Sequence, residues 1–288
     1  MGTSSMYGGP RTGLVPSWAD DSVPGGVPSS NPAVAPLAPG QGGNVPAVPA
    51  GPVPSAAQPD QAGAGAFSGA RTGFTRFART GSRSALGSAL SHYVHSGTGG
   101  ARRAARRMGS SRSAGGRLLG VIRDVERHGT AETLRRLNLP DLAGRPATDV
   151  FLALFEFVCP PGGSIDEAIA RQAMLEAICD VAEAGLGDFD ALTPVQLEEF
   201  FLDFISRSIE GRIVNDIGGR GIILPDDVDA IDNAQRQLHD FVAGCVRSAL
   251  GDRLDDLDRL SDQDLRRTVD DIYEAAFAVL AAVAERAA

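Results

Sequence analysis

The chain has 288 residues, of which 22% are charged and 43% hydrophobic, and its formal net charge at pH 7 is −9. Its three cysteines, Cys159, Cys179 and Cys245, are far apart and form no CxxC motif, which argues against a zinc site or a disulfide framework and predicts buried free thiols. The longest apolar run, AAFAVLAAVA, is about half the length of a membrane span, and the N-terminus lacks the apolar core of a signal peptide. We therefore expect a cytoplasmic protein that does not enter a membrane.

The first segment, residues 1–66, has the composition of a disordered tail. Twelve of the 18 prolines and ten of the 35 glycines lie within residues 1–60. Such a stretch buries too little apolar surface to offset the entropy lost on ordering. The sequence therefore predicts a long Pro/Gly/Ala-rich tail with an exposed N-terminal glycine.

The second segment, residues 67–128, is a basic module. From Gln61 to Arg123 there are eleven arginines and no acid. The stretches FTRFARTG and RSALGSALSHYVHSG predict short helices broken by glycines, and GRLLGVIRDVERHG predicts an amphipathic helix. Four residues share one apolar face of the second helix: Leu86, Leu90, Tyr93 and Val94.

Four arginines of this module stand close together in GGARRAARRMGSS, at Arg102, Arg103, Arg106 and Arg107. On a helix, this spacing places their guanidinium groups on one side. Three interpretations stay open: the cluster contacts the phosphates of a nucleic acid, it pairs with acidic residues of the same chain, or it forms a protein-binding face. The sparse aromatic residues around it argue against readout of bases.

The third segment, residues 129–288, is an acidic helical module. From Asp124 onward the chain has 33 acidic residues against 15 arginines. Helices are predicted in PATDVFLALFEFV, from Ser164 to Gly185, from Thr193, after Pro225 and from Ser261. The helix after Pro225 is expected to turn six residues inward: Val228, Ile231, Leu238, Phe241, Val242 and Cys245.

Two of these helices carry N-terminal capping patterns. Ser164 and Glu167 have the spacing of a capping box. Thr193 is the predicted N-cap of the next helix, with Pro194 at its first position and Gln196 three residues after Thr193. No segment alternates with period two for long enough to predict a strand. The fold class predicted is all-α, an irregular helical bundle preceded by the disordered tail.

The sequence offers no set of residues for catalysis or for a resident cofactor. It contains no Walker loop, HExxH motif or nucleophile elbow. His92 and His95 are three residues apart but have no carboxylate or cysteine close in the sequence, so a packed or solvent-facing pair is favoured over a metal site. We expect no enzyme activity, no catalytic residue, no cofactor and no metal.

Several blocks of the chain resemble one protein family. They are MGTSSMYGGP, LVPSWADD, FTRFARTGSRSALGSALSHYVHSGTGGARRAARRMGSS, GGSIDEAIARQAMLEAI and LEEFFLDFISRSIEGRIVNDIGGRGIILPDDV. In this order they resemble the QatB family, the associated proteins of the bacterial Qat anti-phage defence system. The resemblance covers nearly the whole chain outside the proline-rich segment.

The resemblance implies a role in a four-component operon, with an ATPase, a QueC-like (QatC-type) enzyme and a TatD-type DNase as partners. It also implies that the QueC-like enzyme conjugates a 7-deazaguanine to the N-terminal glycine, which here is Gly2. An α-amine titrates near pH 8, so a sizeable fraction is neutral and nucleophilic at neutral pH. The myristoylation motif fails because Met6 stands where serine or threonine is needed.

Two alternatives to the modified-tail interpretation stay open. The chain could be a nucleic-acid-binding adaptor that works through the arginine cluster. It could equally be a scaffold that links the ATPase to the DNase.

Overall fold

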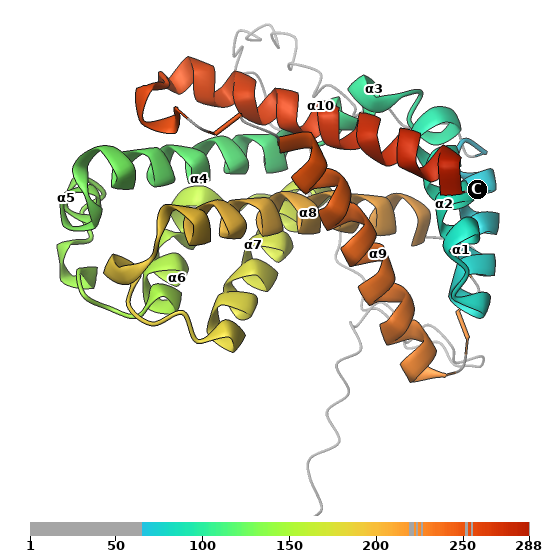
Figure 1. Ribbon diagram of the computed structural model, residues 1–288, viewed down its shortest axis with the longest axis horizontal. Coiled ribbons are helices and arrows are strands. Elements are labelled where there is room, and N and C mark those ends of the chain that lie inside the picture. The colour runs from blue at the N-terminus through green and yellow to red at the C-terminus, as the bar shows by residue number, and fades with distance from the viewer. Residues whose placement is uncertain are drawn as a thin grey trace, which may run out of the picture. The chain divides into compact units, whose positions relative to one another are not determined.

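A computed structural model describes residues 65–218, 222, 224–225, 227–250, 253–254 and 256–287, all within one compact unit, Ser55–Ala288. Every regular element in this part of the chain is a helix, and its only β-type pairing is one isolated bridge between Pro146 and Asp188. The predicted all-α fold is thus confirmed (Figure 1). The predicted disordered tail lies, except for its last two residues, outside the described residues.

The basic module forms four α-helices and one π-helical turn. Their bounds are Ser68–Thr80 (α1), Arg83–His92 (α2), Tyr93–Gly97 (η1), Ala101–Arg106 (α3) and Gly109–His128 (α4). Gly81 ends α1 in the left-handed region, with φ of 62°. The predicted apolar face is confirmed, because Leu86, Leu90, Tyr93 and Val94 are all buried.

Helix α4 begins at Gly109, seven residues before the start that the amphipathic pattern indicates. Glycine and serine are poor helix formers, so the stretch GSSRSAG gives little local signal. Packing accounts for the difference: a Cβ at Gly115 would lie 3.2 Å from a methyl group of Val269 and 3.4 Å from one of Ile205. The absent side chain therefore lets α4 lie close to its neighbours.

The acidic module forms six α-helices and three short 3₁₀ turns. The α-helices are Thr130–Arg136 (α5), Ala147–Val158 (α6), Ile165–Ala184 (α7), Pro194–Gly218 (α8), Val228–Leu250 (α9) and Asp262–Ala287 (α10). The 3₁₀ turns are Pro140–Leu142 (η2), Phe189–Ala191 (η3) and Leu257–Arg259 (η4).

Both predicted capping patterns are confirmed. The Ser164 side chain accepts a hydrogen bond from the backbone N–H of Glu167 at 3.2 Å, and the Glu167 carboxylate accepts one from the N–H of Ser164 at 2.9 Å. Thr193 and Gln196 exchange the same pair of bonds at the start of α8. Each exchange satisfies two backbone N–H groups that would otherwise lack partners.

Helices α8 and α10 organise the core. Helix α8 packs against α7, α9 and α4, while α10 packs against α2, α3, α4 and α9 (Figure 1). One continuous hydrophobic cluster includes residues of both predicted modules. A boundary between residues 128 and 129 stays a prediction.

Two predictions about individual side chains are wrong. Val228 is 67% exposed, because the buried face of α9 begins only at Leu238, almost three turns further on. The thiol of Cys179 is exposed, because the buried stripe of α7 passes through Ala177, Ile178 and Val181 and leaves Cys179 on the other side. Cys159 and Cys245 are buried as predicted.

Candidate functional site

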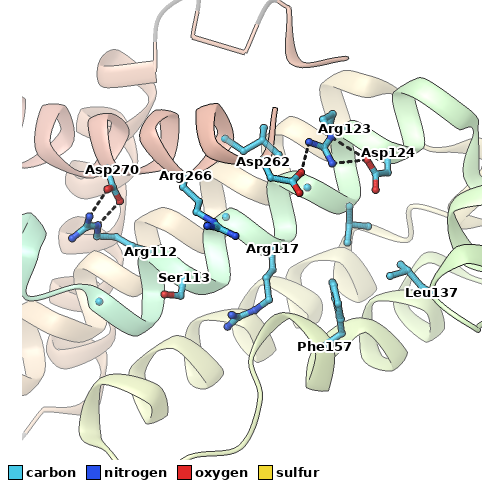
Figure 2. A pocket seen from close by; sticks show the side chains of 15 residues that line it. Arg112, Ser113, Arg117, Arg123, Asp124, Leu137, Phe157, Asp262, Arg266 and Asp270 are labelled. Carbon is cyan, nitrogen blue, oxygen red and sulfur yellow. Dashed lines mark hydrogen bonds and ion pairs between the residues drawn. The ribbon is translucent and has the colours of Figure 1, made fainter. Parts of the chain in front are cut away.

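A groove of about 740 Å³ runs along one side of α4. Its walls come from α4, from the N-terminal half of α10, and from α6 and the residue that follows α5 (Figure 2). Four arginines and three aspartates line it, so its lining carries one positive charge in excess. We call it the α4–α10 groove.

Ion pairs lie at both ends of the α4–α10 groove (Figure 2). At one end, Arg112 of α4 binds Asp270 of α10, with an Nη2–Oδ2 distance of 2.5 Å. At the other end, Arg123 of α4 contacts Asp124 at 2.8 Å and Asp262 of α10 at 2.7 Å. The Arg123 side chain is only 10% exposed. These contacts fix α10 against α4 and give the arginine at each end at least one carboxylate partner.

Arg117 of α4 and Arg266 of α10 lie between these two ends. Neither forms an ion pair with a carboxylate of the described residues. Arg117 is half-buried, and its Nε donates a hydrogen bond to the backbone oxygen of Val158 at 2.8 Å. The stem of Arg266 passes close to Gly116, where a Cβ would lie 3.8 Å from its Cγ. The middle of the groove therefore holds two guanidinium groups without an ion-pair partner among the described residues, although the charge of Arg266 still acts on the nearby Asp262 carboxylate.

An apolar wall adjoins these two arginines. Val121 is buried at the base of the groove, Leu137 is half-buried, and Phe157 of α6 is 48% exposed. Figure 2 shows Phe157 next to Arg117 and Leu137 beyond Phe157, on the side of the groove away from Arg112. The groove thus combines cationic donors with a planar aromatic face.

The structure separates the four arginines singled out in the sequence. Arg102, Arg103 and Arg106 on α3 are exposed. Arg107, the C-cap of α3, is half-buried, with its guanidinium 3.2 Å from the Asp216 carboxylate and 5.8 Å from the centre of the Phe67 ring.

Asp216 is the centre of a buried polar network. Its carboxylate accepts hydrogen bonds from the Tyr93 hydroxyl at 3.0 Å, from Arg107, and from Arg212 at 3.3 Å. Arg212 also reaches Asp166, 3.2 Å away. Burial, reinforced by the charge of Asp216, raises the pKa of the Tyr93 hydroxyl well above its ordinary value. The network ties the loop between α3 and α4 to α7 and α8.

Among the described residues, no group of three or more histidine, cysteine, aspartate or glutamate side chains is arranged to hold a metal ion. His95 lies 2.9 Å from the Glu285 carboxylate of α10, a partner that its sequence neighbours do not reveal. Burial raises the pKa of the Cys159 and Cys245 thiols to about 11, which keeps them protonated at neutral pH. Gly2, the predicted modification site, lies outside the described residues.

Sequence reasoning missed the α4–α10 groove. Arg117 and Arg266 stand in different modules, and no short motif contains both. The excess of arginine before residue 124 was a signal for a basic surface, but it did not indicate which guanidinium groups would meet carboxylates from α10.

Fold and site together define a helical protein with an exposed basic helix and a mixed cationic and aromatic groove. A protein-family profile, described as Qat anti-phage system associated protein QatB, matches residues 99–280. The chain therefore belongs to the QatB family and is a component of a Qat anti-phage system. Neither the curated proteins nor the solved structures include a match to it. None of the helices in the described ranges has the length and apolar content of a membrane span.

Proposed function

We propose that the chain is a non-enzymatic component of the Qat system and the protein substrate of its QueC-like enzyme. The acceptor is the α-amine of Gly2, which becomes free when hydrolysis of the Met1–Gly2 peptide bond removes the initiator methionine. In the reaction, the neutral amine attacks an adenylated 7-deazaguanine carboxylate. An amide bond forms, AMP leaves with the electron pair of the broken C–O bond, and the amine loses one proton.

The observation that carries this proposal is the position of Gly2 directly after Met1 in a chain that belongs to the QatB family. Two properties of the sequence support it. Glycine has no β-carbon, so its amine can approach an activated acyl group closely. The 27 basic residues are all arginine, so no lysine amine competes for the acyl donor.

Intact-mass spectrometry of the full chain, co-expressed with the QueC-like enzyme and without it, tests the proposal. We expect a mass increase only with the enzyme, located by fragmentation on Gly2. A Gly2→Ala variant should lose phage protection, whereas Gly8→Ala in the same tail should retain it. An unshifted mass, or full protection by Gly2→Ala, overturns the proposal.

A second candidate function is binding of nucleic acid through α3. It is favoured by the exposure of Arg102, Arg103 and Arg106, none of which forms an ion pair with a described residue. Arginines that neutralise phosphates release counterions, which makes the affinity fall steeply with salt. An adaptor of this kind would bring the TatD-type DNase to phage DNA.

The salt dependence of duplex DNA binding tests the second candidate. Replacing the three α3 arginines with glutamine should reduce the slope of log K against log salt by about 0.9 for each phosphate that is no longer neutralised. A matched control replaces three exposed arginines that already have acidic partners: Arg135, Arg136 and Arg259. Equal slopes for the two triple variants rule out the α3 surface as the binding site.

A further inference from the structure

We propose that the α4–α10 groove binds a nucleoside phosphate, with Arg117 and Arg266 contacting the phosphate and Phe157 contacting the base. The proposal is independent of the modification at Gly2 and of the exposed arginines on α3. It rests on the charges, the apolar wall and the size of the groove.

The two central guanidinium groups are suited to a phosphate. Arg117 is held through its Nε by the Val158 carbonyl, which leaves both Nη groups as donors. Arg266 approaches from the opposite helix, and Figure 2 shows its guanidinium over α4, while the Arg117 guanidinium extends from α4 toward α6. Arginine forks match phosphate oxygens geometrically, and a side chain held in place loses less entropy when a ligand binds.

The ion pairs at the two ends of the groove limit the negative charge that a ligand can bring. Arg112 and Arg123 already have carboxylate partners on α10, so they do not attract further anions. The two guanidinium groups in the middle have no ion-pair partner among the described residues, and the lining as a whole carries one positive charge in excess. This favours one phosphate group with one or two negative charges over a long polyanion.

The apolar wall supplies a place for a planar base. Phe157 presents nearly half of its surface to solvent, although it lies on a helix whose other two phenylalanines are buried. Aromatic side chains stack on bases irrespective of their identity. Asp124, which also lines the groove, uses only Oδ1 to accept the hydrogen bonds of Arg123, so Oδ2 remains an acceptor for an N–H of the ligand.

Size is consistent with a mononucleotide. Small-molecule sites enclose roughly 300–1,000 Å³, and the groove encloses about 740 Å³. Gly116 and Gly120 face it from α4 without side chains, which keeps the space along the helix open.

Isothermal titration calorimetry of the full chain tests the proposal, with GMP, AMP, guanosine, inorganic phosphate and a single-stranded oligonucleotide as probes. We expect at least one nucleotide to bind, and to bind more tightly than guanosine or inorganic phosphate. Arg117→Gln and Arg266→Gln should each weaken nucleotide binding at least tenfold. Phe157→Leu should weaken nucleotide binding and leave competition by inorganic phosphate unchanged.

Arg145→Gln is the matched control, because it removes an exposed arginine that lies outside the groove and pairs with Asp149, and it should leave nucleotide affinity unchanged. Circular dichroism melting should show that all four variants are folded. The proposal is overturned if neither nucleotide binds at millimolar concentration, or if Arg117→Gln and Arg266→Gln bind as tightly as the wild type. Binding of the oligonucleotide alone, without either nucleotide, also overturns it.

Discussion

The arginines of α3 and those of α4 are neighbours in the sequence, yet the fold places them in different electrostatic environments. On α3, Arg102, Arg103 and Arg106 face solvent. On α4, Arg112 and Arg123 lie against aspartates of α10. Within one basic stretch, the first group is thus available to an external partner, and the second holds two modules together.

The difference follows from what packs on each helix. Helix α3 has six residues and buries only Ala104 and Ala105, so its long side chains extend away from the core. Helix α4 has 20 residues and lies along α7, α8 and α10, so its arginines meet acidic side chains at the edges of the packed faces. Part of the positive charge of the basic stretch is therefore paired with carboxylates inside the fold.

The largest expected effect on the free energy of unfolding is that of replacing Asp216, whose carboxylate pairs with Arg107. Asp216→Asn should lower the free energy of unfolding by about 3–5 kcal/mol, because it leaves two largely buried guanidinium groups, Arg107 and Arg212, without their shared counter-charge. Urea unfolding followed by circular dichroism measures the decrease. The Asp216 side chain is only 6% exposed, so solvent does not compensate.

The matched control is Asp270→Asn, which breaks the pair with Arg112 at a site where the carboxylate is 46% exposed. Solvent-exposed pairs contribute about 0–1 kcal/mol, so this variant should unfold close to the wild type. Equal destabilisation of the two variants would show that burial does not separate the two kinds of arginine interaction.

A smaller effect is expected for Arg123→Gln. This guanidinium group donates to the Leu260 carbonyl at 3.1 Å as well as to Asp124 and Asp262, and its own side chain is only 10% exposed. Its replacement therefore removes charge-assisted hydrogen bonds from a largely buried side chain, while the Leu260 carbonyl keeps a donor in Arg127 and the Asp262 carboxylate faces solvent. We expect a decrease of about 1–3 kcal/mol in the free energy of unfolding. A decrease smaller than that of Asp270→Asn would contradict the role assigned to Arg123 in joining α4 to α10.

The same ion pair predicts a pH dependence. The hydrogen bond and charge of Arg123 hold the pKa of Asp262 below its ordinary value. Because the folded pKa is depressed, the pair stabilises the fold above the unfolded value of about 3.9, and this contribution disappears as pH falls through the folded pKa. NMR titration of the Asp262 carboxyl should show an upward shift of its pKa in Arg123→Gln.

Asp264 is the internal control for this titration. Its pKa is also lowered, but by hydrogen bonds from Ser261, and Arg123 is not among the causes. The Asp264 pKa should therefore stay in place in Arg123→Gln. A shift of both carboxyl groups would indicate a general change of structure at the start of α10 instead of the removal of one ion pair.

Much of the fold was predictable because its signals are local. The Ser164 and Thr193 caps and the periodic apolar positions each depend on residues within a few turns. The early start of α4 was not predictable in this way, because Gly115 has no helix-forming preference and its close neighbours come from α8 and α10. The helix is stabilised there by tertiary packing.

The candidate sites show the same contrast between local signals and contacts between helices. The basic character of residues 67–128 is visible in the composition, whereas the partners of individual arginines are not. Asp216 and Arg107 are more than 100 residues apart in the chain, as are Arg117 and Arg266. Spacing patterns describe one helix. These side chains come from different helices, and the sequence patterns do not encode how those helices are placed relative to one another.

The smallest expected effect on stability is that of the exposed arginines on α3. Replacing Arg102, Arg103 and Arg106 with glutamine should change the free energy of unfolding by no more than about 0.5 kcal/mol, because the three side chains are exposed. Arg107→Gln, one residue further on, should cost several times more, since it uncouples Asp216 from a half-buried partner. If urea unfolding instead ranks the triple variant as the less stable, the α3 arginines have a structural role and the contrast with α4 does not hold.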